Sequence, residues 1–315
     1  MGITQSAIEK LDQIGLFKKD GMAVLDVGSS NLYSASEDGV VNFLSQYAPD
    51  LENGDVSAFA KQLTQGSGYD LASGGTNDAF VGQLFEKAGF VYNAIDIADG
   101  YRTTIVDLNH QNPPEDFVGK FDLVLNFGTT EHLLNQYNAF RFIHNSVKVG
   151  GYIVHSLPCV GYSNHGYLTY TPRCFFDLAG YNQYEVTDFW YDAVDTDNDL
   201  FAPLRDYATY FPTLNQTIAN SGATSGGQIV TTLNVPDVAI FIVMRKVHDT
   251  PFVGPMETST SVGDVLPDGQ PSTSSGTAAV ESGAGGAEAS KTAPTHSKPR
   301  QLAIDLRDAW RAFVS

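Results

Sequence analysis

The stretch VLDVGSSNLY, from Val24 to Tyr33, runs from a short apolar strand into a turn of small residues, with one carboxylate, Asp26, at the join. Gly28 has no Cβ, so a ligand can approach the backbone of this turn closely. An acid here repels a pyrophosphate and suits a ligand with an amine or another positive charge. The glycine fingerprint of dinucleotide sites is incomplete, because Ser30 and Tyr33 occupy its next two glycine positions. A purely structural turn is the alternative.

Apolar strands alternate with helical segments over residues 1 to 250, and several strands are continuous apolar runs. Such runs are typical of strands that helices cover on both faces. The alternation therefore predicts an α/β fold with a doubly wound, mostly parallel sheet, in which ligands bind at the carboxyl ends of the strands. The strand candidates are Ala23 to Val27, Phe90 to Ile97, Phe121 to Phe127, Gly151 to Leu157, Gln183 to Tyr191 and Val238 to Val247.

Composition divides the chain into four parts. Residues 1–20 form an amphipathic helix, and residues 21–250 form the main domain, with an expected insertion at about residues 48–75 near the pocket mouth. Residues 251–300 are rich in Ser, Gly, Ala, Thr and Pro and predict a disordered linker. Residues 301–315 have apolar side chains at helical spacing, so a short amphipathic helix at the end of the tether could dock on the domain or on a protein partner.

The chain is acidic, with a formal net charge of −18. This charge opposes binding to a phosphate backbone, so we expect no nucleic-acid partner. No apolar run is long enough for a membrane span. The only two cysteines, Cys159 and Cys174, form neither a CxxC pair nor a disulfide framework, which favours a cytoplasmic protein.

Polar residues end three further segments. Asp96, with Ile97 beside it, follows a second apolar strand and could accept both hydroxyls of a ribose. Asp107 could accept an exocyclic amine while Leu108 covers a purine face. Asn126 ends the next apolar strand. This order of strand tips predicts a nucleoside pocket with an acceptor site beside it.

These segments together resemble the class I S-adenosylmethionine-dependent methyltransferases over roughly residues 20 to 250. LDVGSSN resembles the first motif of that family, FDLVLNFGTTEHL its fourth segment, and VKVGGYIV the turn before its fifth strand. The late strands YEVTDFWYDA and DVAIFIVMRK resemble its closing antiparallel hairpin. The resemblance implies a Rossmann-like sheet of seven strands with an antiparallel last strand.

The resemblance also implies roles for individual residues toward S-adenosyl-L-methionine. Asp26, Gly28 and Ser30 would line its methionine part, and Asp96 with Ile97 would hold the ribose. Asp107 and Leu108 would contact the adenine, and Asn126 the methionine end or the acceptor. The spacing departs from the family pattern, because Asp96 lies 70 residues beyond Asp26, far more than one strand-helix-strand unit needs.

The expected reaction is methylation of a small polar acceptor, with O-methylation of a sugar or glycan precursor as the leading hypothesis. Candidates for the base are His165, His132, His155 and Glu131. Glu131 and His132 alone are too few ligands to predict a metal site. Two alternatives stay open: an NAD-dependent oxidoreductase, and a non-catalytic binding module that uses the C-terminal helix to recruit a partner.

Overall fold

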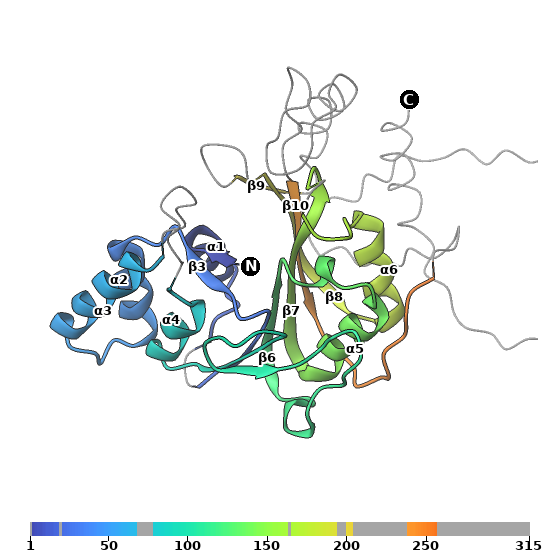
Figure 1. Cartoon of the computed structure of the whole chain (residues 1–315), viewed down its shortest axis with the longest axis horizontal. Coiled ribbons are helices and arrows are strands. Elements are labelled where there is room, and N and C mark those ends of the chain that lie inside the picture. The colour runs from blue at the N-terminus through green and yellow to red at the C-terminus, as the bar shows by residue number, and fades with distance from the viewer. Residues whose placement is uncertain are drawn as a thin grey trace, which may run out of the picture.

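The computed structural model describes residues 2–18, 21–67, 78–162, 165–193, 200–203 and 238–256. One eight-stranded sheet with the order β5-β4-β2-β6-β7-β10-β8-β9 forms its centre (Figure 1). The strands of this sheet are β2 (Ala23–Val27), β4 (Val91–Asp96), β5 (Thr103–Ile105), β6 (Phe121–Phe127), β7 (Val147–Val160), β8 (Glu185–Ala193), β9 (Leu200–Pro203) and β10 (Val238–Arg245). A separate two-stranded sheet pairs β1 (Gly2–Thr4) with β3 (Asn31–Tyr33). The helices are α1 (Gln5–Gln13), α2 (Glu37–Tyr47), α3 (Asn53–Gln65), α4 (Val81–Lys87), α5 (Gln136–Ser146) and α6 (Pro172–Asn182), with short 3-10 turns η1 (Glu115–Phe117) and η2 (Thr130–His132).

The strand directions confirm the predicted fold class. Strands β5, β4, β2, β6 and β7 pair in parallel, and β10 runs antiparallel to both β7 and β8. The six strand candidates together with β5 make up the seven strands expected of a Rossmann-like sheet, and the short strand β9 extends its edge beside β8. The chain order reverses between β2 and β6, so their carboxyl ends flank the crevice where ligands of such sheets bind.

Helices cover both faces of the sheet. Alternate residues of each strand point to opposite faces, so Val24 and Leu25 enter different core clusters. One cluster packs the sheet against α5 and α6 through large side chains such as Phe142 and Phe175. The other packs it against α1 to α4, and Figure 1 shows α2, α3 and α4 together at one end of the molecule.

The chain makes an excursion after Ser30 and comes back beside Ser30 at Val81, the first residue of α4. The amide of Val81 donates to the carbonyl of Ser30 at 3.1 Å, and Asn31 bridges to Phe80. The excursion of residues 31–80 therefore begins and ends at one point, with wider bounds than the insertion expected at 48–75. Asp96 lies 70 residues after Asp26, and 50 of these belong to the excursion. The remaining spacing, about 20 residues, is that of one strand-helix-strand unit.

The excursion is part of the packed domain. Helices α2 and α3 bury Val40, Leu44, Val56 and Leu63 in the same core cluster as Phe85 of α4. A buried apolar face of this kind stabilises the domain as core helices do. Residues 68–77 lie outside the described residues.

Both ends of the described chain contact the domain. Helix α1 lies within the segment 1–20 and buries Ile8 and Leu11. At the other end, Phe252 is buried, and the amide of Val253 donates to Oδ1 of Asn182 at 2.8 Å. The first residues assigned to the linker thus pack on α6, whereas the rest of the predicted linker and the predicted C-terminal helix lie outside the described residues. Among the helices that the structure describes, none combines the length and hydrophobicity needed to cross a bilayer.

Candidate active site

The turn after β2, residues 28–30, lies at the carboxyl edge of the sheet. Gly28 has φ of +121°, a conformation that favours glycine. Its amide donates to the carbonyl of Ile95 at 2.7 Å, which fixes the turn against the end of β4. The hydroxyl of Ser29 lies 2.8 Å from Oγ1 of Thr103 in β5. Two neighbouring strands therefore define the shape of this turn.

Asp26 holds this turn from inside. Its fully buried carboxylate accepts hydrogen bonds from the amide and the hydroxyl of Ser30, at 2.6 and 3.0 Å, and from the hydroxyl of Tyr92 at 2.7 Å. Burial raises the pKa of Asp26, whereas these hydrogen bonds lower it. The expected direct contact with a ligand ammonium is therefore corrected, because the carboxylate is enclosed and already bonded. Asp26 and the buried Ser30 act as positioning residues for the backbone of the turn.

Asp96 and Ile97 lie beside the turn at the end of β4. Oδ1 of Asp96 accepts the amide of Ala98 at 3.0 Å in an exposed loop. The Ile97 side chain is 75% exposed. A nucleoside bound here would place its base on the exposed side chain of Ile97 and its ribose hydroxyls near the carboxylate of Asp96. The predicted roles of both residues therefore stay proposals.

Asp107 and Leu108 follow β5 and differ from each other in exposure. Asp107 accepts the amide of Asn109 and pairs with Nδ1 of His110, both at 2.8 Å, and the bond to His110 lowers the pKa of Asp107. Leu108 is 5% exposed and belongs to the core. Leu108 therefore does not present the open purine cover that the sequence predicts, whereas Ile97 and Ile105 are exposed apolar side chains near this edge.

Asn126 and His155 form a buried pair between β6 and β7. Nδ2 of Asn126 lies 2.9 Å from Nδ1 of His155 and donates to Oγ1 of Thr130 at 3.0 Å. Burial lowers the pKa of His155 to about 3, so its imidazole is neutral. Both side chains are buried, and Oδ1 of Asn126 has no hydrogen-bond partner among the described residues. The predicted contacts of Asn126 with the ligand and of His155 with the acceptor stay predictions.

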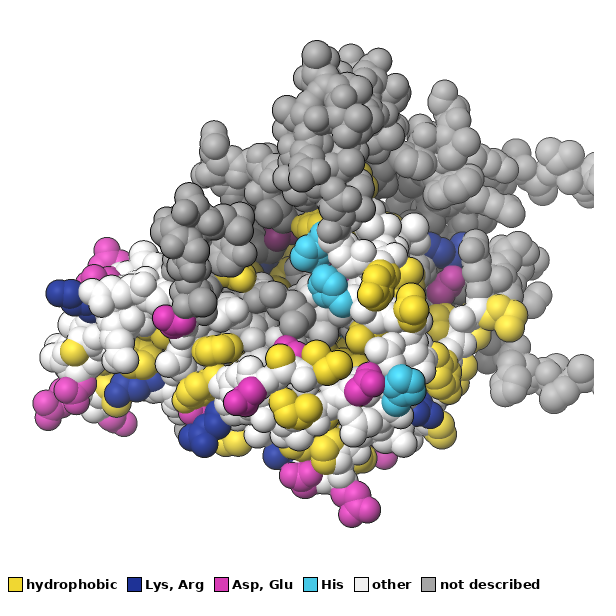
Figure 2. All heavy atoms as spheres, in the orientation of Figure 1, with side chains coloured by type: hydrophobic (Ala, Val, Ile, Leu, Met, Phe, Trp, Pro, Cys, Tyr) yellow, Lys and Arg dark blue, Asp and Glu magenta, His cyan; other side chains and the backbone are white. Residues whose placement is uncertain are grey.

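Glu131, His132 and His165 come together next to the turn. Nε2 of His132 lies 3.9 Å and Nε2 of His165 lies 3.6 Å from Oε1 of Glu131. Glu131 is buried, and burial raises its pKa to about 7, whereas both histidine side chains are about half exposed. The structure thus assembles three of the four predicted catalytic side chains. Figure 2 shows two adjacent histidine side chains at the surface of the face in view.

The cluster of Glu131, His132 and His165, called the acceptor-side cluster after its predicted role, is linked to the turn through the hydroxyl of Thr129. The hydroxyl of Thr129 donates to the carbonyl of Val27, the residue before Gly28. Thr129 is two residues from Glu131, so the end of β6 connects the cluster directly to the end of β2. Sequence spacing could not show this link, because 102 residues separate its two ends.

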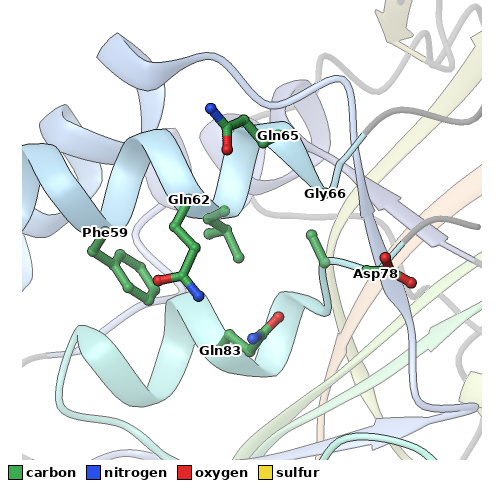
Figure 3. Close-up of a pocket in the computed structure, with 8 residues that line it drawn as sticks. Phe59, Gln62, Gln65, Gly66, Asp78 and Gln83 are labelled. Carbon is green, nitrogen blue, oxygen red and sulfur yellow. The ribbon is translucent and has the colours of Figure 1, made fainter.

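A separate cavity of about 320 Å³ lies between α3 and α4 (Figure 3). The side chain of Gln62 on α3 extends toward α4, whereas the side chain of Gln83 accepts the amide of Phe80 at the start of its own helix at 2.8 Å. The described residues that line it include none of the strand-tip residues; they are Phe59, Gln62, Leu63, Gln65, Gly66, Asp78, Ala79 and Gln83. This cavity is therefore distinct from the edge that carries Gly28 and Glu131.

The sequence matches the family model described as a methyltransferase domain over residues 3–196, more than half of the chain. The chain belongs to this methyltransferase family. No curated protein matches the sequence. The matched range includes the turn after β2 and all three residues of the acceptor-side cluster.

Two solved structures are similar to this chain. Phosphoethanolamine N-methyltransferase 2 of Haemonchus contortus, in complex with S-adenosyl-L-methionine, is 12% identical with a TM-score of 0.38, over 76% of this chain and 52% of that chain. A SAM-dependent methyltransferase of Archaeoglobus fulgidus is 12% identical with a TM-score of 0.37, over 77% of this chain and 94% of that one. The chain spans about half the length of the Haemonchus protein.

Gly82 in α4 lies next to the turn after β2, and the sequence alone does not indicate this. When the excursion is left out, Gly82 follows Ser30 by two positions and completes the order Gly28, Ser30, Gly82. A Cβ on Gly82 would lie 2.3 Å from the Tyr92 ring, so glycine permits close packing of α4 on β4. The segment VGQLF before an apolar strand was the available signal, but 50 intervening residues separated it from the turn.

Proposed function

We propose that this chain transfers a methyl group from S-adenosyl-L-methionine to an oxygen atom of a small polar acceptor, such as a sugar or glycan precursor. The family match supports a methyltransferase and not the NAD-dependent oxidoreductase that the sequence left open. One observation carries the assignment of the cofactor edge. The hydrogen bond from Gly28 to Ile95 places the tip of β4, with Asp96, directly beside the glycine turn.

The residues present fit this cofactor. The Gly28 turn offers backbone without an intervening Cβ, Asp96 offers a carboxylate for the ribose hydroxyls, and Ile97 offers exposed apolar surface for the base. S-adenosyl-L-methionine supplies an electrophilic methyl group on a sulfonium. The chain then has to bind and orient the acceptor, and alignment alone can contribute roughly 7–11 kcal/mol.

The acceptor-side cluster supports oxygen as the methylated atom. A hydroxyl must lose its proton during transfer, and Glu131, His132 and His165 are groups that can receive or stabilise charge at that point. His165 lies in a segment with Tyr162 and Tyr167, and polar aromatic surfaces suit sugars and similar metabolites.

The thiols of Cys159 and Cys174 are free, which supports a reducing, cytoplasmic location.

Methyl transfer can be measured directly with S-adenosyl-L-methionine that carries a labelled methyl group. The full chain is incubated with a panel of sugars, sugar nucleotides, phenols and amines, and the label in each acceptor is counted. We expect transfer to a hydroxyl acceptor and a large loss of turnover in the His165→Ala variant. Binding of the cofactor without transfer to any acceptor would favour the non-catalytic binding module, and transfer confined to amines would contradict O-methylation.

A further inference from the structure

The carboxylate of Glu131 is buried, and no hydrogen bond from the described residues offsets its loss of solvent. Both of its oxygens are inaccessible to solvent, and neither has a hydrogen-bond partner among the described residues. Buried carboxylates are normally paired, hydrogen-bonded or bound to a metal, because an isolated buried charge is costly. Two close glycines make room for this side chain: a Cβ on Gly166 would lie 2.8 Å from Cγ of Glu131, and one on Gly128 would lie 3.2 Å from Oε1.

Two histidines face this carboxylate at distances close to those of metal ligands. One ligand atom from each of Glu131, His132 and His165 lies within 4.8 Å of the others, and the shortest separations are 3.6 and 3.9 Å. Ligand atoms bound at about 2.0–2.1 Å to one tetrahedral ion lie roughly 3.4 Å apart. Small side-chain rotations would therefore bring all three atoms onto one ion.

Hydrogen bonds hold the backbone at Glu131 and His132 and in the described residues that follow His165. The amides of Tyr167 and Leu168 donate to the carbonyl of Glu131 at 2.7 and 3.2 Å, which ties the segment after His165 to η2. The amide of His132 donates to the carbonyl of Thr129 at 3.1 Å. The side chain of Gln136 donates to the carbonyl of Thr130 at 2.7 Å. Ligands held on a defined backbone lose little entropy when they bind an ion.

We propose that Glu131, His132 and His165 form a binding site for a divalent first-row transition-metal ion such as Zn²⁺, Mn²⁺ or Fe²⁺. Two imidazoles with one carboxylate suit these ions better than Mg²⁺ or Ca²⁺, which prefer oxygen ligands. Three protein ligands leave open positions for water or an oxygen of the acceptor. The metal site stands on the geometry alone, and only the use of its open positions by an acceptor rests on the proposed function.

Binding of Co²⁺ and Zn²⁺ to the full chain tests the site without any assay of activity. The chelator-treated protein is titrated with Co²⁺, followed by visible absorption, and then with Zn²⁺, followed by calorimetry. We expect one ion per chain, displacement of Co²⁺ by Zn²⁺, and an affinity at least about tenfold weaker in His132→Ala and His165→Ala. Glu131→Gln keeps the shape of the side chain while removing its charge, so it should weaken metal binding without unfolding the protein.

His248→Ala is the matched control, because His248 is exposed outside the cluster. Its titration should equal that of the unchanged protein. Absence of a stoichiometric ion in the unchanged protein, or equal affinity in the His165→Ala, Glu131→Gln and control proteins, would overturn the proposal. A parallel titration with S-adenosyl-L-methionine separates the two ideas, since metal binding without cofactor binding would remove the proposed function and leave the metal site intact.

Discussion

The buried carboxylate of Asp26 holds the turn of residues 28–30 in place through hydrogen bonds. Asp26→Ala would leave the amide of Ser30 and the hydroxyl of Tyr92 without their acceptor, at a cost of about 2–4 kcal/mol in the free energy of unfolding. Tyr92→Phe removes one donor and should cost about 1 kcal/mol. Urea unfolding of both variants measures the difference. Equal losses would mean that Asp26 does not support the turn through Ser30.

His155 makes the stability of the protein dependent on pH. Its pKa is about 3 in the folded protein and about 6.5 in an unfolded chain, so the unfolded state binds the proton first as pH falls. The contribution is complete above about pH 6.5 and is lost as pH falls toward 3. Between pH 7 and 4 the free energy of unfolding should fall by up to about 3 kcal/mol more than in His155→Gln. Parallel curves for the two proteins in urea would contradict this burial.

The sequence predicts which residues stand at the strand tips but not the direction of each side chain. Asp26 comes two residues after Val24 and therefore points to the same face of the sheet, toward helices α1 to α4. On that face the hydroxyl of Tyr92 donates to its carboxylate. Asn126 lies opposite His155 in the sheet register and meets it within the domain. A one-residue change of phase moves a side chain to the other face of a sheet. The sheet register therefore places the side chains of Asp26 and Asn126 inside the domain, which the sequence alone does not show.

Helix α4 depends on a close approach to β4 at Gly82. Gly82→Ala places a methyl group within 2.3 Å of the Tyr92 ring, which should cost about 1–3 kcal/mol in unfolding free energy and disturb the hydroxyl of Tyr92 bound to Asp26. Gly54→Ala on α3 is the matched control, since a Cβ there has no atom within 4 Å and should be neutral or slightly stabilising. A Gly82→Ala protein as stable as the control would show that α4 tolerates a wider separation.

The apolar strands were predictable, and the bounds of the excursion were not. Strands β2 and β6 match their predicted bounds, and four of five and six of seven of their residues are buried. Helices α2 and α3 of the excursion are ordinary amphipathic helices, and nothing local marks the point where Ser30 meets Val81. That contact is made by backbone hydrogen bonds between distant residues, which composition and periodicity do not report.

The composition of the C-terminal segment gives a prediction for the whole molecule. A chain that ends at Met256 keeps Phe252 and the bond from Tyr181 to the carbonyl of Met256. Residues 257–315 contain few large apolar side chains before Leu302, so their removal should lower the melting temperature by no more than about 2 °C. Thermal unfolding followed by circular dichroism measures this. A drop of ten degrees or more would place the last segment in the core.

The central claim is that the carboxyl edge of the sheet binds S-adenosyl-L-methionine beside Gly28, with Asp96 on its ribose. Calorimetric titration of the full chain with this cofactor tests it most directly, with Asp96→Ala as the variant and Asp99→Ala, in the same exposed loop, as the control. We predict one site of micromolar affinity, weakened about 10- to 100-fold by Asp96→Ala and unchanged by Asp99→Ala. Absence of binding, or equal affinity in the two variants, would contradict the claim.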